Sequence, residues 1–161
     1  MKKLSALSIL LFWVLFASVA NARETAVLLP VTGPLTPLEL TELTREVVTG
    51  LSSVFDVKHG EEVNRVVKQV FKEESKKTDC DETSCYRQIA VQYHAEKIIA
   101  LRLTQIETER YLLTLNVYDV VTGDVTVSNK RECTSCTFEK IKILARDLIG
   151  AVSVSKDVLN K

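Results

Sequence analysis

The chain has 161 residues, of which 46% are hydrophobic, with 21 basic and 21 acidic side chains. This balanced charge argues against a nucleic-acid-binding protein, which would carry a clustered basic face. Glycine and proline are few, no repeat is visible and no low-complexity linker divides the chain, so we predict a single folded domain.

The first 22 residues have the features of a cleaved secretory signal peptide. Two lysines precede an almost wholly apolar run over residues 7–19, and Ala20-Asn21-Ala22 supplies a small-x-small cleavage site. The apolar run is shorter than the roughly 20 residues that span a bilayer, and no cysteine for a lipid anchor lies near the boundary. We therefore predict cleavage between Ala22 and Arg23, export to the periplasm, and a mature chain without a membrane span.

Removal of this leader takes away two lysines and no acidic residue, which leaves 19 basic and 21 acidic side chains and a net charge of −2. A mature chain of this size is expected to bury roughly two-thirds of its unfolded surface. We predict one domain over residues 23–153, followed by a polar tail over residues 154–161.

The first half of the mature chain predicts a strand, a helix and a second strand. Residues 25–31 are nearly all apolar, as in a strand covered on both faces. Thr36, Pro37 and Glu39 mark a helix start with a capping hydroxyl, a proline at the first helical position and a capping glutamate. The apolar positions that follow at helical spacing are Leu40, Leu43, Val47, Leu51 and Val54. A strand over residues 55–58 would then complete a right-handed crossover with two parallel strands.

Two further helices are expected before the remaining strands. Gly60 begins the first of them, and its apolar stripe gives way to the charged residues 72–77, which we predict to be a solvated helix end and loop. The second helix follows Cys85. Its apolar face consists of Tyr86, Ile89, Ala90 and Tyr93.

Three runs of alternating apolar and polar residues follow, over residues 99–104, 113–118 and 125–128. They predict an antiparallel three-stranded meander with one buried face. Asp119 is interpreted as a turn residue that binds backbone amides ahead of Gly123. A last helix, beginning near Thr137, would cover the apolar face of the sheet, and we expect the chain beyond Ser153 to fray.

The predicted order is therefore β-α-β-α-α-β-β-β-α, which defines an α/β (α+β) domain. Its mixed sheet would have about five strands and would form two or three layers with the helices.

The mature chain contains four cysteines, and an even number in an exported protein predicts disulfides. Pairing Cys80 with Cys85 and Cys133 with Cys136 would close very short loops and stabilise by about 2 kcal/mol each, whereas cross-pairing would close loops of about 50 residues and give about 4 kcal/mol. We favour the local pairs, because each of them brackets a turn.

Two other uses of these cysteines are weighed against the structural one. Cys133 and Cys136 precede a helix, where a thiol pKa can be lowered for disulfide exchange. All four thiols could also supply tetrahedral ligands to zinc. An oxidising compartment and the presence of a second pair favour structural disulfides.

No motif in the sequence indicates catalysis. A nucleophile elbow, a phosphate-binding loop and a dinucleotide fingerprint are all absent. His59 and His94 stand alone at element ends, where a surface or capping role is expected. Glu61 and Glu62 lie at a helix start, where the helix dipole favours acidic residues. No metal or other cofactor is predicted.

Several stretches resemble a domain shared by TolB amino-terminal regions, CsgG-type secretion proteins and LpoB-type envelope lipoproteins. They are residues 95–103, the run from Tyr111 to Val125 with its Asp-x-x-Thr-Gly turn at residues 119–123, and the opening residues 26–30 before a long helix. The sequence resembles a paired-cysteine variant of this domain. The resemblance implies a non-enzymatic envelope domain that binds other proteins or assembles with copies of itself. The acylated cysteine of CsgG and LpoB and the propeller of TolB are missing, so pore formation and Pal binding are not implied.

Three classes of function follow. The leading interpretation is a periplasmic protein-interaction domain that contributes to a cell-envelope assembly. The second is a thiol-disulfide protein that uses Cys133 and Cys136. The third is a small-ligand binding protein, for which the sequence names no residue.

Overall fold

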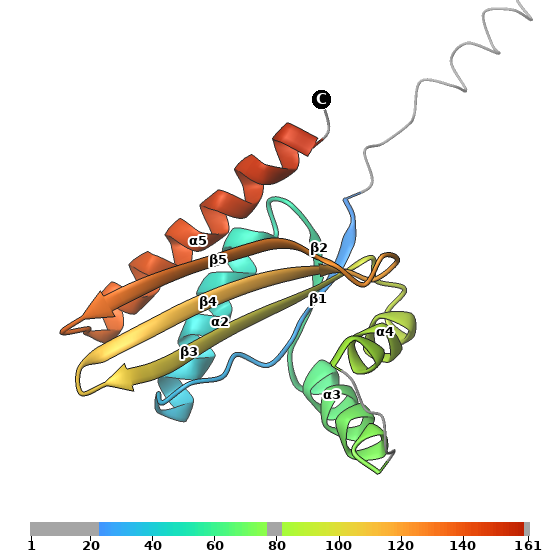
Figure 1. The fold of residues 1–161 in the computed structure, drawn as a ribbon, viewed down its shortest axis with the longest axis horizontal. Coiled ribbons are helices and arrows are strands. Elements are labelled where there is room, and N and C mark those ends of the chain that lie inside the picture. Colours follow the sequence, from blue (N-terminus) through green and yellow to red (C-terminus); the bar gives the residue numbers. More distant parts are fainter. Residues whose placement is uncertain (1–22, 77–81, 160–161) are drawn as a thin grey trace, which may run out of the picture.

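The structure, a computed structural model, describes residues 23–76 and 82–159, with side chains as far as Ser153. A five-stranded sheet of order β2-β1-β3-β4-β5 runs through it (Figure 1). β1 (Thr25–Leu28) pairs in parallel with β2 (Asp56–Lys58) and with β3 (Lys97–Glu107). β4 (Arg110–Asp119) and β5 (Val125–Thr134) extend the sheet in antiparallel pairing. The mixed sheet and the antiparallel meander are therefore confirmed.

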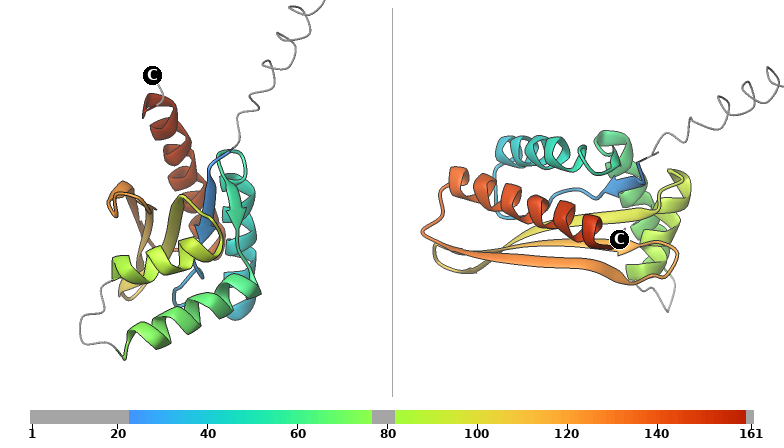
Figure 2. Two further views of the ribbon diagram at one scale, coloured as in Figure 1. Left: turned by 90° about the vertical axis from the view of Figure 1, so that its right-hand side faces the viewer. Right: turned by 90° about the horizontal axis from the view of Figure 1, so that it is seen from above.

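The helices lie on both faces of this sheet (Figure 2). α2 (Pro37–Leu51) and α5 (Phe138–Leu159) pack side by side on one face. α3 (Glu61–Glu74) and α4 (Glu82–Gln92) pack on the other face, at one end of the strands. The predicted element order is confirmed. None of the helices in the described ranges is long and apolar enough to cross a membrane.

The larger hydrophobic core fills the space between the sheet and helices α2 and α5. Alternate residues of β3 and β4 point into it, because successive side chains of a strand face opposite sides of the sheet. Its fully buried members include Leu43, Val47, Leu51, Ile99, Leu115, Ala145 and Leu148. The remaining sheet positions contribute to a smaller core under α3 and α4, which includes Val27, Val63, Ile89, Ala90 and Ile98.

The start of α2 has the predicted capping box. The Thr36 hydroxyl accepts a hydrogen bond from the Glu39 backbone amide at 3.3 Å, and the Glu39 carboxylate accepts one from the Thr36 amide at 2.9 Å. These bonds satisfy amides that have no partner within the helix. The pKa of Glu39 is lowered, chiefly by the hydrogen bonds from Thr36.

Element bounds differ from the predictions at several places. α4 begins at Glu82 and contains Cys85, instead of following it. β1 ends at Leu28 instead of residue 31: the Leu29 amide still donates to the Ile99 carbonyl at 2.9 Å, and the next bond to β3 comes only from the Thr32 amide, to the Leu101 carbonyl at 3.4 Å. β5 continues beyond residue 128 to Thr134, through a polar stretch. α5 continues past Ser153 to Leu159, into the segment that we predict to be a polar tail.

The prediction of a solvated end to α3 is wrong at one residue. Glu74 is only 4% exposed, and its carboxylate accepts a hydrogen bond from the Gln88 side chain on α4. The last turn of α3 packs against α4, so this carboxylate is enclosed by a neighbouring helix that the local charge pattern does not reveal.

Candidate interaction surfaces

The outer edge of the sheet is formed by β5. In the part of the chain that the structure describes, no strand pairs with its far side. Seven of its ten residues are exposed and none is buried. The opposite edge, β2, has only three residues. β5 is therefore the longer of the two unpaired edges, and an unpaired edge is a template for another strand.

The hydrogen bonds at the end of β5 identify which backbone groups face outward. The Ser135 amide donates to the Glu109 carbonyl at 2.8 Å, so these two residues form a hydrogen-bonded pair. Such pairs alternate along an antiparallel ladder, and Leu113 lies opposite Arg131 in the same register. Arg131 therefore bonds to β4, whereas the amide and carbonyl groups of Lys130 point away from it. The same holds for Ser128 and Glu132.

The face of the sheet opposite α2 and α5 is only partly covered. α3 and α4 lie over one end of the strands, and no other helix of residues 23–76 and 82–159 lies over the other end of this face. The side chains of this open face are mainly polar, and Ser128 donates to the Asn116 side chain across β4 and β5 at 2.8 Å. Arg110 and Glu132 form an ion pair there. The side chains of Ser128 and Glu132, whose backbone groups point outward from β5, therefore lie on the open face.

A hollow of about 290 Å³ marks the border between α4 and the open face, and Glu82, Tyr86, Arg102 and Tyr118 are among its lining residues. The Tyr86 hydroxyl donates to Glu82 at 2.5 Å, and the Tyr86 and Tyr118 rings lie 4.8 Å apart. Burial, followed by the bond to Glu82, raises the pKa of Tyr86. The Tyr86 hydroxyl therefore acts as a hydrogen-bond donor beside a packed pair of tyrosine rings.

The turn between β4 and β5 is held by Asp119. One carboxylate oxygen accepts from the Val121 and Thr122 amides at 2.8 and 2.9 Å, and the other pairs with the Lys97 ammonium at 2.5 Å. Hydrogen bonding from Lys97, followed by that from the Thr122 amide, lowers the pKa of Asp119. Gly123 has φ 80°, a left-handed conformation that favours glycine.

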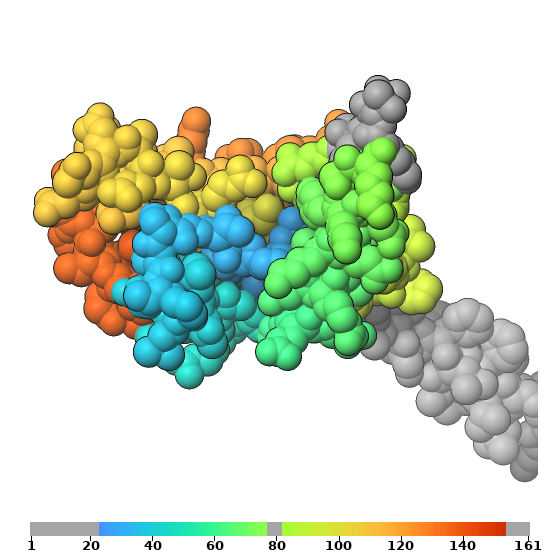
Figure 3. Space-filling model, turned by 90° about the horizontal axis from the view of Figure 1, so that it is seen from below, coloured from blue at the N-terminus to red at the C-terminus, as the bar shows by residue number. Residues whose placement is uncertain are grey.

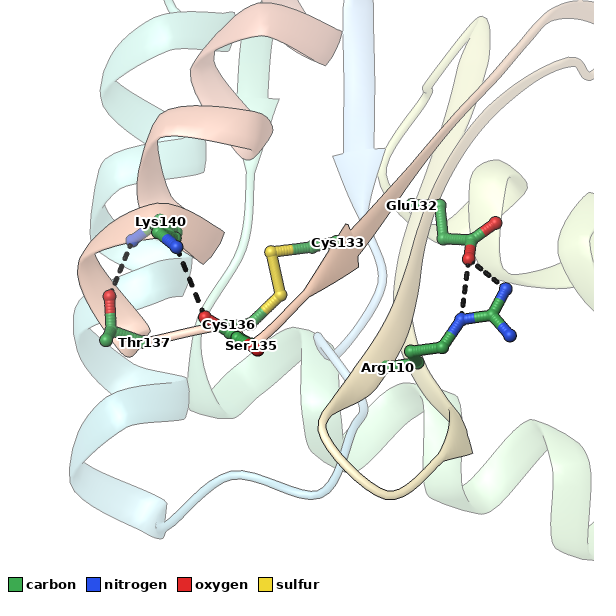
Figure 4. The surroundings of a disulfide bond; sticks show 7 residues. All are labelled: Arg110, Glu132, Cys133, Ser135, Cys136, Thr137 and Lys140. Carbon is green, nitrogen blue, oxygen red and sulfur yellow. Dashed lines mark hydrogen bonds and ion pairs between the residues drawn. A yellow bond between two sulfur atoms is a disulfide. The ribbon is translucent and has the colours of Figure 1, made fainter.

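The end of β5 is joined to the start of α5 by a disulfide between Cys133 and Cys136, whose Cα atoms lie 5.8 Å apart (Figure 4). Ser135, between them, has φ 52°. Its carbonyl accepts a hydrogen bond from the Lys140 ammonium at 3.3 Å. The bridge therefore fixes the turn through which the chain leaves the sheet and enters α5.

Replacing either Cys133 or Cys136 by serine is expected to lower the free energy of unfolding by about 2 kcal/mol, because the closed loop is very short. Chemical denaturation of Cys133→Ser and Cys136→Ser, each compared with the oxidised wild type, should give similar losses. A Cys133→Ser variant that captures a partner through Cys136, in an adduct that reductant removes, would contradict a purely structural role.

A second candidate surface is a groove of about 640 Å³ between α2 and α3. Figure 3 shows this hollow between the two helices, with the chain that follows β1 on its floor. One wall consists of Leu40, Thr44, Arg45 and Val48 on α2. The other consists of His59, which follows β2, and of Glu61 and Asn64 in the first turns of α3. No local sequence pattern marks these residues as a binding group, because they come from separate elements.

The other predicted site residues do not form a cluster. His59 and His94 are exposed, and His94 has φ 49°. Arg23 donates from its guanidinium to the Ser52 carbonyl at 2.6 Å. Ala22 and Cys80 lie outside the described residues. The predicted disulfide between Cys80 and the buried Cys85 therefore also lies outside them. Within the described ranges, no three histidine, cysteine or acidic side chains lie close enough to hold a metal ion.

No protein-family model matches the chain, and no curated protein matches it either. Several solved structures are similar. The LpoB C-terminal domain from Salmonella enterica has 16% identity and a TM-score of 0.47, over 78% of this chain and 93% of that one. Lipoprotein GNA1162 from Neisseria meningitidis has 11% identity and a TM-score of 0.48, over 80% and 96%. TolB from Acinetobacter baumannii has 12% identity and a TM-score of 0.46, over 79% and 27%. LpoB and TolB are among the proteins whose domain the sequence resembles.

Proposed function

We propose that this chain is a non-enzymatic protein-interaction domain of the cell envelope, which acts in the periplasm after removal of its leader. It binds a partner protein by accepting an additional strand along β5. The observation that carries this proposal is the row of outward backbone groups on Ser128, Lys130 and Glu132, together with the exposure of these residues.

The geometry of β5 supports strand addition as the mode of binding. Main-chain hydrogen bonds supply affinity in such complexes, and alternate side chains supply specificity. The irregular register lies at the beginning of β5, near Val125 and Val127, so the pairing from Ser128 to Thr134 is regular. A partner strand would meet Lys130 and Glu132 on the open face, which favours side chains of complementary charge.

Replacing Lys130 by proline is expected to abolish partner binding while the domain stays folded. Proline removes an amide that faces away from β4, so no ladder hydrogen bond is lost. The measurement is an affinity pull-down from intact cells after mild crosslinking, with wild type and Lys130→Pro compared by the amount of partner recovered.

Two variants serve as controls for this experiment. Lys130→Ala removes the side chain but keeps the amide, so it should retain most of the binding. Arg131→Pro removes an amide that bonds to β4, and it should lower the free energy of unfolding by about 2 kcal/mol more than Lys130→Pro does. Undiminished partner recovery with folded Lys130→Pro would overturn binding through this edge. A partner that proves to be a second copy of the chain would make the edge an oligomer contact.

Thiol-disulfide exchange through Cys133 and Cys136 is the second candidate function, because the bridge lies directly before the first turn of α5. The cysteine variants described above separate it from the interaction function, since only exchange produces adducts that disappear with reductant.

A further inference from the structure

The groove between α2 and α3 lies where the sheet topology predicts a ligand site. β1 leads into α2 on one face of the sheet, and its parallel neighbour β2 leads into α3 on the other face. The chain therefore diverges beyond the carboxyl ends of these two strands. In open α/β sheets, ligands bind in the crevice at such a point.

The α2 wall of this groove is apolar in character. Leu40 and Val48 are half-buried hydrophobic side chains on this wall, and Pro30 and Val31 form part of the floor. The threonine hydroxyls on the same wall are engaged within the helix. Thr41, Thr44 and Thr49 donate to the carbonyls of Pro37, Leu40 and Arg45, at 2.9, 2.7 and 2.9 Å.

A few polar groups remain available along the groove. Arg45 is exposed on the α2 wall, and Asn64 is half-buried on the α3 wall. Neither side chain has a hydrogen-bond or ion-pair partner among the described residues. His59 and Glu61 complete the titratable groups of the lining. Arg45 is thus the one arginine or lysine side chain among these lining residues.

We propose that this groove binds an amphipathic carboxylate, a small molecule with an apolar body and one anionic head. The apolar body lies against Leu40, Val48 and Pro30. The carboxylate pairs with Arg45 and accepts a hydrogen bond from the Asn64 side-chain amide. The volume of about 640 Å³ is within the range of small-molecule sites, which are mainly apolar with a few polar groups that fix orientation. The Glu61 carboxylate repels the carboxylate of the ligand and therefore lowers the affinity of the groove for it.

The test is a titration of the mature chain with decanoate, below the concentration at which decanoate forms micelles, followed by backbone amide NMR. We expect saturable shifts at residues of the α2 and α3 walls. Arg45→Gln should raise the Kd about tenfold, because it removes a charge-assisted contact. Glu61→Gln should lower the Kd, because it removes the repulsion. Arg87→Gln, an exposed arginine on α4 outside the groove, should leave the Kd unchanged.

1-Decanol, which shares the apolar chain but lacks the charge, separates groove binding from non-specific hydrophobic contact. We expect it to bind more weakly than decanoate and to be insensitive to Arg45→Gln. Absence of saturable decanoate binding, equal Kd values for wild type and Arg45→Gln, or shifts confined to other surfaces would overturn the proposal. These results bear only on the groove and leave the proposed role of β5 to its own test.

Discussion

Replacing Leu115 by alanine is expected to lower the free energy of unfolding by about 3 kcal/mol. Leu115 lies at the centre of β4 with no exposed surface, in the core beneath α2 and α5. Truncation removes buried methyl groups and leaves a cavity that the surrounding side chains fill only in part. Equilibrium denaturation with urea, monitored by circular dichroism, measures the loss.

Leu112→Ala is the matched control for this experiment. Leu112 is on the same strand but faces the open side of the sheet, where it is half-buried. We expect a loss of about 1 kcal/mol, because less apolar surface is removed from contact. Equal losses for the two variants would contradict the assignment of faces on β4.

Replacing Asp119 by alanine is also expected to cost about 3 kcal/mol at pH 7. The change removes acceptors for the Val121 and Thr122 amides and leaves the largely buried Lys97 ammonium without its counter-ion. Asp119→Asn should cost about half as much, because the amide oxygen can still accept from the turn. Asp124→Ala, on an exposed residue of the same turn, should stay within about 0.5 kcal/mol of wild type.

The contribution of Asp119 should also depend on pH. Its pKa is lower in the folded protein than in the unfolded chain, where the ordinary value is about 3.9. The stabilisation is therefore fully present above about pH 4 and is lost as the pH falls through the folded pKa. Denaturation curves of wild type and Asp119→Asn from pH 7 to pH 2.5 should converge at the acid end. A difference in the free energy of unfolding between the two proteins that stays constant over this pH range would contradict the ionic pairing with Lys97.

The sequence predicted those elements in which a local pattern and the tertiary environment agree. The alternation of Ile99, Leu101 and Leu103 places these side chains in one core, because the opposite face of β3 is more polar. The capping residues Thr36 and Glu39 define the start of α2 through contacts within four residues. Such signals need no knowledge of the rest of the chain.

The second half of β5 could not be predicted in this way. Beyond Ser128 the residues are mostly polar, so the alternation of apolar and polar residues stops there, and the predicted strand ends at residue 128. The strand nevertheless continues, because the backbone groups of Asn129 and Arg131 find partners on β4. Pairing with a neighbour, which a single strand does not encode, therefore determines the length of the proposed binding edge.

Neither the groove nor the burial of Glu74 could be predicted, because both arise from contacts between separate elements. The walls of the groove come from α2 and α3, whose residues are separated by an entire strand in the sequence. Glu74 is buried only because Gln88 and α4 pack against it. From the sequence alone, a carboxylate within a charged run is predicted to be exposed to solvent, and only the packing of α4 shows that Glu74 is buried.

Site-specific photocrosslinking in intact cells is the most direct test of whether β5 accepts a partner strand. A benzophenone amino acid would be placed at Lys130 on β5 and, as the control, at the exposed Ile143 on α5. We expect a discrete protein adduct from position 130, in similar yield with and without reductant, and little or none from position 143. No adduct from position 130, or equal adducts from both positions, would contradict binding of a partner strand at β5. An adduct only from position 143 would move the binding surface to α5.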